Sequence, residues 1–269
     1  MKKLKLASFL LGASLLIGAC SPAPEATPQA TVEFQTPPVM VTYYPVTGIT
    51  TDAIFTSMAT AGPKLSDGTR VEGRFSPIPT VSWKLSSGNR PHCSLKSLSI
   101  NFASEIVLPK HTGGLTPDLA AKWALYAAGV AAHEQRHLDI YLEAAQSLKI
   151  ALLAVPAQEF DRDCAKLDAA LSSVLAAERV AHDAKQAQFH TEADAQRAAI
   201  LTPLTMLYAR LGGLLDEINV INLRMTGLAQ SGRWPEHNAL VPPQNRMVAE
   251  YNALRDEYSA LREVVRWTP

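Results

Sequence analysis

The chain has 269 residues, of which 47% are hydrophobic, and it carries 25 lysines and arginines against 25 aspartates and glutamates. That length and apolar content are enough to bury a sizeable core, in one domain with an extension or in two. The balanced charge gives no electrostatic basis for contact with nucleic acid, so we exclude that class of partner.

The first 19 residues predict a lipoprotein signal peptide. Three lysines precede an apolar run over residues 6–17, which is too short to span a bilayer comfortably. The run ends at Cys20 in the sequence IGAC, which resembles the bacterial lipobox. By that resemblance Cys20 becomes the lipidated first residue of the mature chain. An ordinary signal peptide or a short membrane anchor is the alternative.

Residues 20–31 are rich in proline, alanine and threonine and predict an extended tether between a membrane and a folded domain. Ser21, after the cysteine, resembles the outer-membrane sorting pattern of a Gram-negative cell. We therefore expect a protein of the cell envelope, held by lipid on Cys20 at the periplasmic face of the outer membrane. No later run is expected to span a membrane.

A small β-rich region follows the tether. Residues 39–46, 81–85 and 95–108 are rich in β-branched and aromatic side chains and predict strands, and residues 51–58 predict a short helix. Two cysteines remain after lipidation, Cys93 and Cys164. Because an export signal leads to an oxidising compartment, a disulfide between them is the simplest interpretation, stabilising the fold by about 4 kcal/mol. Metal binding by this pair is disfavoured because Cys-x-x-Cys spacing is absent.

A long helix is predicted from Thr116, a capping residue followed by proline, to Pro156. It contains His133, Glu134 and His137 in the pattern His-Glu-x-x-His. On a helix this spacing puts both imidazoles on one face, where they can bind one Zn²⁺, while the glutamate can act on a water molecule. An edge strand beside such a helix could hold an extended peptide by strand addition.

The apolar period of this helix places both histidines on its predicted buried stripe. The alternative to a zinc site is therefore a pair of core histidines satisfied by hydrogen bonds. The stripe consists of Leu119, Trp123, Tyr126, Val130, His133, His137, Ile140, Ala144 and Leu148.

A second helix is predicted from Ala157 to Ile200, antiparallel to the first. A turn at residue 155 or 156 would bring residues 133–137 opposite residues 173–179. Glu178 is then the acid on the inward stripe and our predicted third zinc ligand, with His182 as the next candidate. The alternative for Glu178 is a half-buried salt bridge, for example with Arg136.

Further groups around the histidines are predicted by proximity along the helix. Asp139 or Glu143 could hold the second nitrogen of a zinc-bound histidine. Tyr126 lies on the same stripe but two turns away, so no oxyanion donor is assigned.

The last part of the chain, residues 201–269, predicts an antiparallel helical hairpin. Apolar residues recur three and four apart over residues 204–228 and again over residues 247–265, as in a coiled coil. Thr202-Pro203 is expected to break the preceding helix, and a loop of roughly fifteen residues is expected between the two heptad segments. The hairpin would pack on the first helix pair or bind a protein partner.

The chain resembles the bacterial family of predicted secreted zinc-dependent proteases, long carried as a domain of unknown function. The resemblance covers about residues 40–190. It is carried by Tyr43-Tyr44-Pro45-Val46-Thr47-Gly48, Trp83, Cys93, the strand before Leu108-Pro109, His133-Glu134 with His137, and Cys164.

This resemblance implies that His133 and His137 bind zinc, that Glu134 is the catalytic base and that Cys93 pairs with Cys164. Members commonly finish with a segment of the Tyr-Asp, Thr, His-Gly type, whereas this chain has FHTEADA over residues 189–195. If the late histidine of the family is a ligand, His190 would have to take its place.

The sequence therefore predicts an α+β, zincin-like fold over residues 32–200, with a small antiparallel sheet packed on a long active-site helix hairpin. A coiled-coil-like helical extension follows over residues 201–269. The predicted function is a lipid-anchored envelope peptidase that uses Zn²⁺ and Glu134 to hydrolyse a peptide or protein substrate. The alternative is an inactive protease-like scaffold that binds an envelope partner through its C-terminal helices.

Overall fold

The computed structural model describes residues 30–87 and 92–268. The predicted signal peptide, Cys20 and nearly all of the predicted tether lie outside the described residues. Thr31, predicted as the last residue of the tether, instead begins the first strand.

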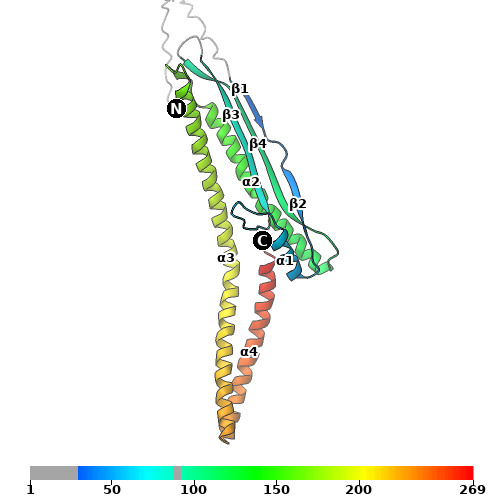
Figure 1. Cartoon of the computed structure of the whole chain (residues 1–269). Coiled ribbons are helices and arrows are strands. Elements are labelled where there is room, and N and C mark those ends of the chain that lie inside the picture. Colours follow the sequence, from blue (N-terminus) through cyan, green and yellow to red (C-terminus); the bar gives the residue numbers. More distant parts are fainter. Residues whose placement is uncertain (1–29, 88–91, 269) are drawn as a thin grey trace, which may run out of the picture.

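The sheet is built around one long strand, β4 (His92–His111). β3 (Arg74–Ser87) pairs with it antiparallel, and β1 (Thr31–Gln35) and β2 (Met40–Val46) pair with it in parallel, one after the other along its other side (Figure 1). The two-residue β5 (Gln158–Glu159) pairs with the start of β4.

The prediction of an antiparallel sheet is therefore wrong for β1 and β2, and the sheet is mixed. The chain reverses direction once through α1 (Thr51–Ala61) and its following loop, and again between β3 and β4, which are antiparallel. Two reversals make β2 parallel to β4. The strand predictions located β2, β4 and part of β3 but missed β1, and they could not count the reversals between the strands.

One face of the sheet is covered by two antiparallel helices, α2 (Pro117–Leu153) and the first part of α3 (Ala165–Gln230) (Figure 1). α2 begins as predicted: the Leu119 N–H donates to Thr116 Oγ1 at 3.4 Å, and Pro117 occupies the first helical position. Cys93 of β4 and Cys164, the residue before α3, form the predicted disulfide with their Cα atoms 5.3 Å apart.

α3 continues through Pro203 without a break, so the predicted end of the helix near Ile200 is wrong. Proline removes one helical N–H, which leaves the Ala199 carbonyl without its usual donor. Both residues are exposed, so water can satisfy that carbonyl, and the Thr202 hydroxyl donates to the Ala198 carbonyl at 2.8 Å.

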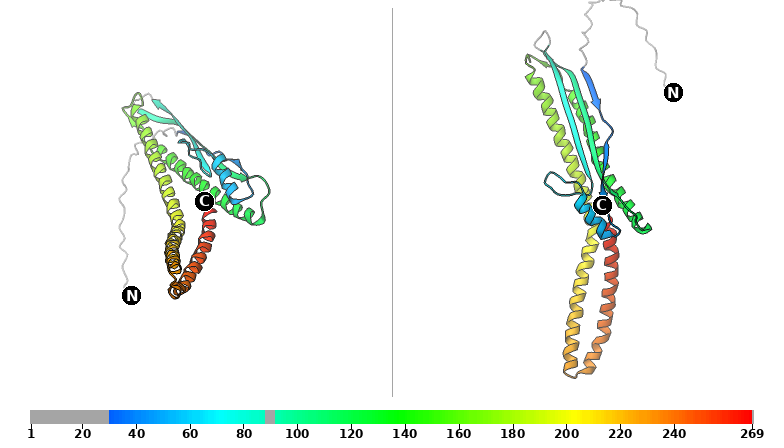
Figure 2. Two further views of the ribbon diagram at one scale, coloured as in Figure 1. Left: turned by 60° about the horizontal axis from the view of Figure 1, so that its bottom comes forward. Right: turned by 45° about the vertical axis from the view of Figure 1, so that its right-hand side comes forward.

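The second part of α3 pairs with α4 (Trp234–Arg266), and the two project beyond the sheet as a hairpin (Figure 2). The connection covers only Ser231–Arg233, and Pro235, Pro242 and Pro243 lie within α4 rather than in the predicted long loop. By length and composition alone α3 could also cross a membrane, contrary to our expectation for the later sequence. This is weak evidence, because core helices of soluble proteins pass the same test.

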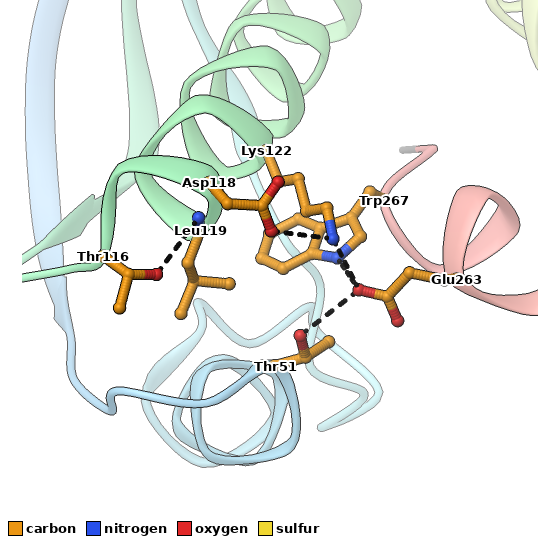
Figure 3. Close-up of polar contacts among 7 residues, drawn as sticks. All are labelled: Thr51, Thr116, Asp118, Leu119, Lys122, Glu263 and Trp267. Atoms are coloured by element: carbon orange, nitrogen blue, oxygen red, sulfur yellow. Dashed lines mark hydrogen bonds and ion pairs between the residues drawn. The ribbon is translucent and has the colours of Figure 1, made fainter. Parts of the chain in front are cut away.

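The end of α4 returns to the sheet-bearing part of the molecule and docks there (Figure 3). Trp267 is 9% exposed and packs edge-on against Phe55 of α1 and Tyr126 of α2, with ring centroids 5.2 and 6.0 Å away. Glu263 Oε1 accepts from the Trp267 indole at 3.0 Å, from Lys122 at 3.2 Å and from the Thr51 hydroxyl at 3.5 Å. One carboxylate thus connects three helices.

Candidate metal centre

The buried stripe of α2 runs one residue away from the predicted one at the His-Glu-x-x-His segment. Glu134 is buried with 5% exposure, followed by Leu138 and Tyr141 against the sheet, whereas His133 and His137 are half-buried. The spacing of three and four residues was predicted correctly, but two adjacent stripes of the helix fit that spacing in this segment. The structure assigns the sheet-facing position to the glutamate and leaves the histidines facing α3.

Three histidines converge between α2 and α3. One ligand nitrogen from each of His133, His137 and His190 lies within 4.8 Å of the other two. His133 Nε2 and His137 Nε2 are 3.2 Å apart. Two nitrogens bound to one tetrahedral zinc at about 2.0–2.1 Å are about 3.3 Å apart, so the pair already has the separation that such an ion requires.

The structure brings His190, and not Glu178, close to His133 and His137. Glu178 is half-buried and lies outside both the histidine group and the cavity beside it. The error came from the turn. The connection between the helices runs from Ala154 to Cys164, later than predicted. In an antiparallel helix pair, moving the centre of the turn one residue later moves the residue that faces a given position two residues later. The residues opposite His137 therefore come from a later part of α3 than we predicted.

Glu134 is held in a narrow space between α2 and the start of β3. A Cβ atom at Gly73 would lie 2.7 Å from Glu134 Oε1, so only glycine fits there without displacing the carboxylate. Burial raises the pKa of Glu134 to about 7, opposed by a hydrogen bond from the Phe75 backbone N–H. A carboxylate with a pKa near neutrality suits a general base. Burial also lowers the pKa of His133 and of His137, which favours their neutral, metal-binding form.

A cavity of about 890 Å³ opens beside these groups. Its walls come from the segment before β3, from the middle of α2 and from α3, and Thr268 after α4 also contributes. Phe189 lies against both His133 and His137, with ring centroids 4.8 and 4.9 Å apart. The cavity is large enough for a small substrate or for a segment of a larger one.

The edge of β3 beside the cavity offers few hydrogen-bond donors. Among the described strands β3 pairs only with β4, so its other edge is free. Backbone N–H groups alternate between the two edges of a strand, and a proline within a strand is tolerated where its nitrogen lies on the free edge. Pro77 and Pro79 lie on that same edge and have no N–H. Strand addition by a peptide, which the sequence left open, is therefore disfavoured along this stretch.

The remaining predicted neighbours do not contact the histidines. Asp139 accepts from Gln135 at 2.9 Å, and Glu143 forms ion pairs with Arg136 and Lys185. Tyr126 is 1% exposed beneath Trp267, in the core rather than in the cavity.

Sequence reasoning missed Gln186, whose Oε1 lies 2.5 Å from His137 Nδ1. Nothing in the local sequence distinguishes this glutamine, because its role depends on the register between α2 and α3.

A family described as bacterial protein of unknown function (DUF922) matches residues 41–196, more than half of the chain. The chain belongs to this family. The DUF922 region contains all three histidines, Glu134 and both disulfide cysteines, whereas the helical hairpin lies outside it. The DUF922 description assigns no activity. Neither a curated protein nor a solved structure matches the chain.

Proposed function

We propose that this DUF922 protein is a zinc-dependent hydrolase of the cell envelope that cleaves peptide bonds. The observation that carries the proposal is the convergence of three histidines from two helices, beside a buried glutamate with a near-neutral pKa and a cavity. Three imidazole ligands with an open fourth position are a common catalytic zinc arrangement. His133, His137 and His190 would hold the metal.

Zinc, when bound, would supply Lewis acidity, lowering the pKa of water and polarising a substrate carbonyl. The protein contributes the proton transfer. Glu134 would take a proton from the attacking water on a carboxylate oxygen and give it to the leaving amine. Gly73 and the Phe75 N–H hold that carboxylate in place. Lipid on Cys20 would keep the enzyme at the membrane, where its substrate would be an envelope peptide or protein.

A second function is favoured by the hairpin. Large apolar side chains on its surface are more than half exposed, including Met206, Tyr208, Val220 and Leu223. Such a surface is typical of a site for a protein partner. The alternative proposal is therefore a scaffold without catalytic activity that binds an envelope protein through residues 201–269.

The first test is the zinc content of the mature chain from residue 21 onward, which keeps every described residue. We expect about one zinc per chain in the parent, in Glu178→Ala and in His182→Ala, and none in His137→Ala or His190→Ala. An equal zinc content in the parent and His190→Ala would refute the three-histidine site. Hydrolysis of casein should then require Glu134, with Glu134→Gln as the inactive control. Zinc binding without hydrolysis would favour the scaffold.

A further inference from the structure

We infer that Gln186 is a positioning residue that fixes the tautomer of His137 and thereby prepares it to bind metal. The inference rests on the proposed function for the identity of the ligand, but its structural basis is a set of hydrogen bonds between α2 and α3. Gln186 is half-buried on α3 and contacts three polar groups, two of them belonging to His137.

The orientation of the Gln186 amide follows from its partners. Its Nε2 lies 3.3 Å from the backbone carbonyl oxygen of His137. A carbonyl oxygen only accepts hydrogen bonds, so the group facing it must be the amide NH₂. The other end of the amide, Oε1, then faces His137 Nδ1 at 2.5 Å. An amide oxygen only accepts, so His137 Nδ1 must carry the hydrogen.

This hydrogen determines the chemistry of the other ring nitrogen. A neutral imidazole, the form that binds metal, has one N–H and one lone pair. With the hydrogen on Nδ1, the lone pair is on Nε2, the atom 3.2 Å from His133 Nε2. Metal binding needs that lone pair. Gln186 therefore aims the metal-binding atom of His137 into the three-histidine group.

The same reasoning gives a role to His182, which we had considered as a ligand. Gln186 Nε2 also lies 3.1 Å from His182 Nε2, and the amide can only donate, so this nitrogen accepts. In a neutral ring the hydrogen is then on His182 Nδ1, which lies 3.2 Å from Asp183 Oδ1. The side-chain hydrogen bonds thus run from His137 to Gln186, from Gln186 to His182 and from His182 to Asp183. His182 supports Gln186 instead of binding metal.

The competing explanation is that Gln186 only joins two helices. The two explanations differ for Gln186→Glu, which keeps an acceptor for His137 Nδ1–H but loses both amide donor contacts. A residue that only joins the helices should be impaired in Gln186→Glu as much as in Gln186→Ala. Gln188→Ala is the matched control, because Gln188 lies on the same helix and is exposed, with its amide 2.8 Å from Glu192.

The experiment is zinc affinity at pH 7.5 by competition with a chelator, together with ¹⁵N NMR of the histidine rings in the zinc-free mature chain. We expect Gln186→Ala to bind zinc 10- to 100-fold more weakly and to show a mixed tautomer at His137. We expect Gln186→Glu and Gln188→Ala to bind within about threefold of the parent, with hydrogen on Nδ1.

Equal affinity and an unchanged tautomer in Gln186→Ala would overturn the inference, and so would equal loss of affinity in Gln186→Ala and Gln186→Glu. If the parent binds no zinc, the proposed function fails, yet the His137 tautomer in the zinc-free parent and in Gln186→Ala still decides the role of Gln186. Thermal unfolding of each variant checks that the fold is intact.

Discussion

The two halves of α3 have the same helical period but different surroundings. Over residues 165–200 the helix packs against α2 and the sheet, with Leu167 and Leu171 fully buried. Over residues 201–230 it packs against α4, where Leu211, Leu214 and Ile218 form a narrow seam and Leu223 is 75% exposed. An apolar stripe therefore indicates that a helix is covered, but not by how much.

The difference extends to polar groups. In the first half, Gln186 and His190 project toward side chains of α2, so that helix packing assembles the candidate site. In the second half, Arg210 pairs with Glu250 of α4 on the surface, a contact of the kind that contributes little to stability. The first half is thus a structural part of the site, whereas the second half can change with smaller consequences for it.

The largest expected effect is loss of the disulfide, which supports only the first half. The double variant Cys93→Ser, Cys164→Ser opens a loop with a sequence separation of 71 residues. We expect a loss of about 4 kcal/mol in the free energy of unfolding. Chemical denaturation measures it. The control is the same comparison of variant and parent in dithiothreitol, which reduces the disulfide of the parent. If the variant is still less stable than the parent by the same amount, the effect comes from the serines and not from the bond.

Replacing the buried carboxylate should have the next largest effect. The folded protein raises the pKa of Glu134 from 4.5 to about 7, so ionisation costs stability as pH rises through this range. In zinc-free protein, Glu134→Gln should gain up to about 3 kcal/mol at pH 8 and almost nothing at pH 4.5. Thermal unfolding at both pH values tests this. A gain independent of pH would mean that the pKa of Glu134 is the same in the folded and unfolded states.

Undocking the end of α4 tests how the second half is held. Trp267→Ala removes the packing on Phe55 and Tyr126 and the indole that donates to Glu263. We expect a loss of about 3 kcal/mol and faster amide exchange near the end of α4. Exchange near His137 should stay unchanged. Faster exchange at His137 as well would show that the two halves are not separable.

The smallest effect is expected on the exposed face of the hairpin. Leu223→Ala should change stability by less than about 0.5 kcal/mol, whereas Leu171→Ala on the same helix should cost at least about 2 kcal/mol. Urea denaturation of the two variants compares the halves directly. Similar losses would mean that an additional surface covers Leu223 in solution.

Local signals in the sequence predicted local structure well. Thr116 and Pro117 gave the start of α2, and two cysteines in a chain with a predicted export signal gave the disulfide. Relations between elements were not predictable in the same way. Whether Glu134 or His133 faces the sheet depends on which of two adjacent stripes the strands cover, and the partner of His137 depends on where the turn before α3 ends. His190 and Gln186 acquire their roles only from that register.

The continuity of α3 through Pro203 has a mechanical consequence. A helix of 66 residues is a rod roughly 100 Å long. One end is fixed by the disulfide between Cys93 and Cys164. The far end packs against α4, which is anchored at Trp267. A force applied at the turn of the hairpin, Ser231–Arg233, would therefore be transmitted along the rod that carries His190, through Pro203, where one helical hydrogen bond is missing.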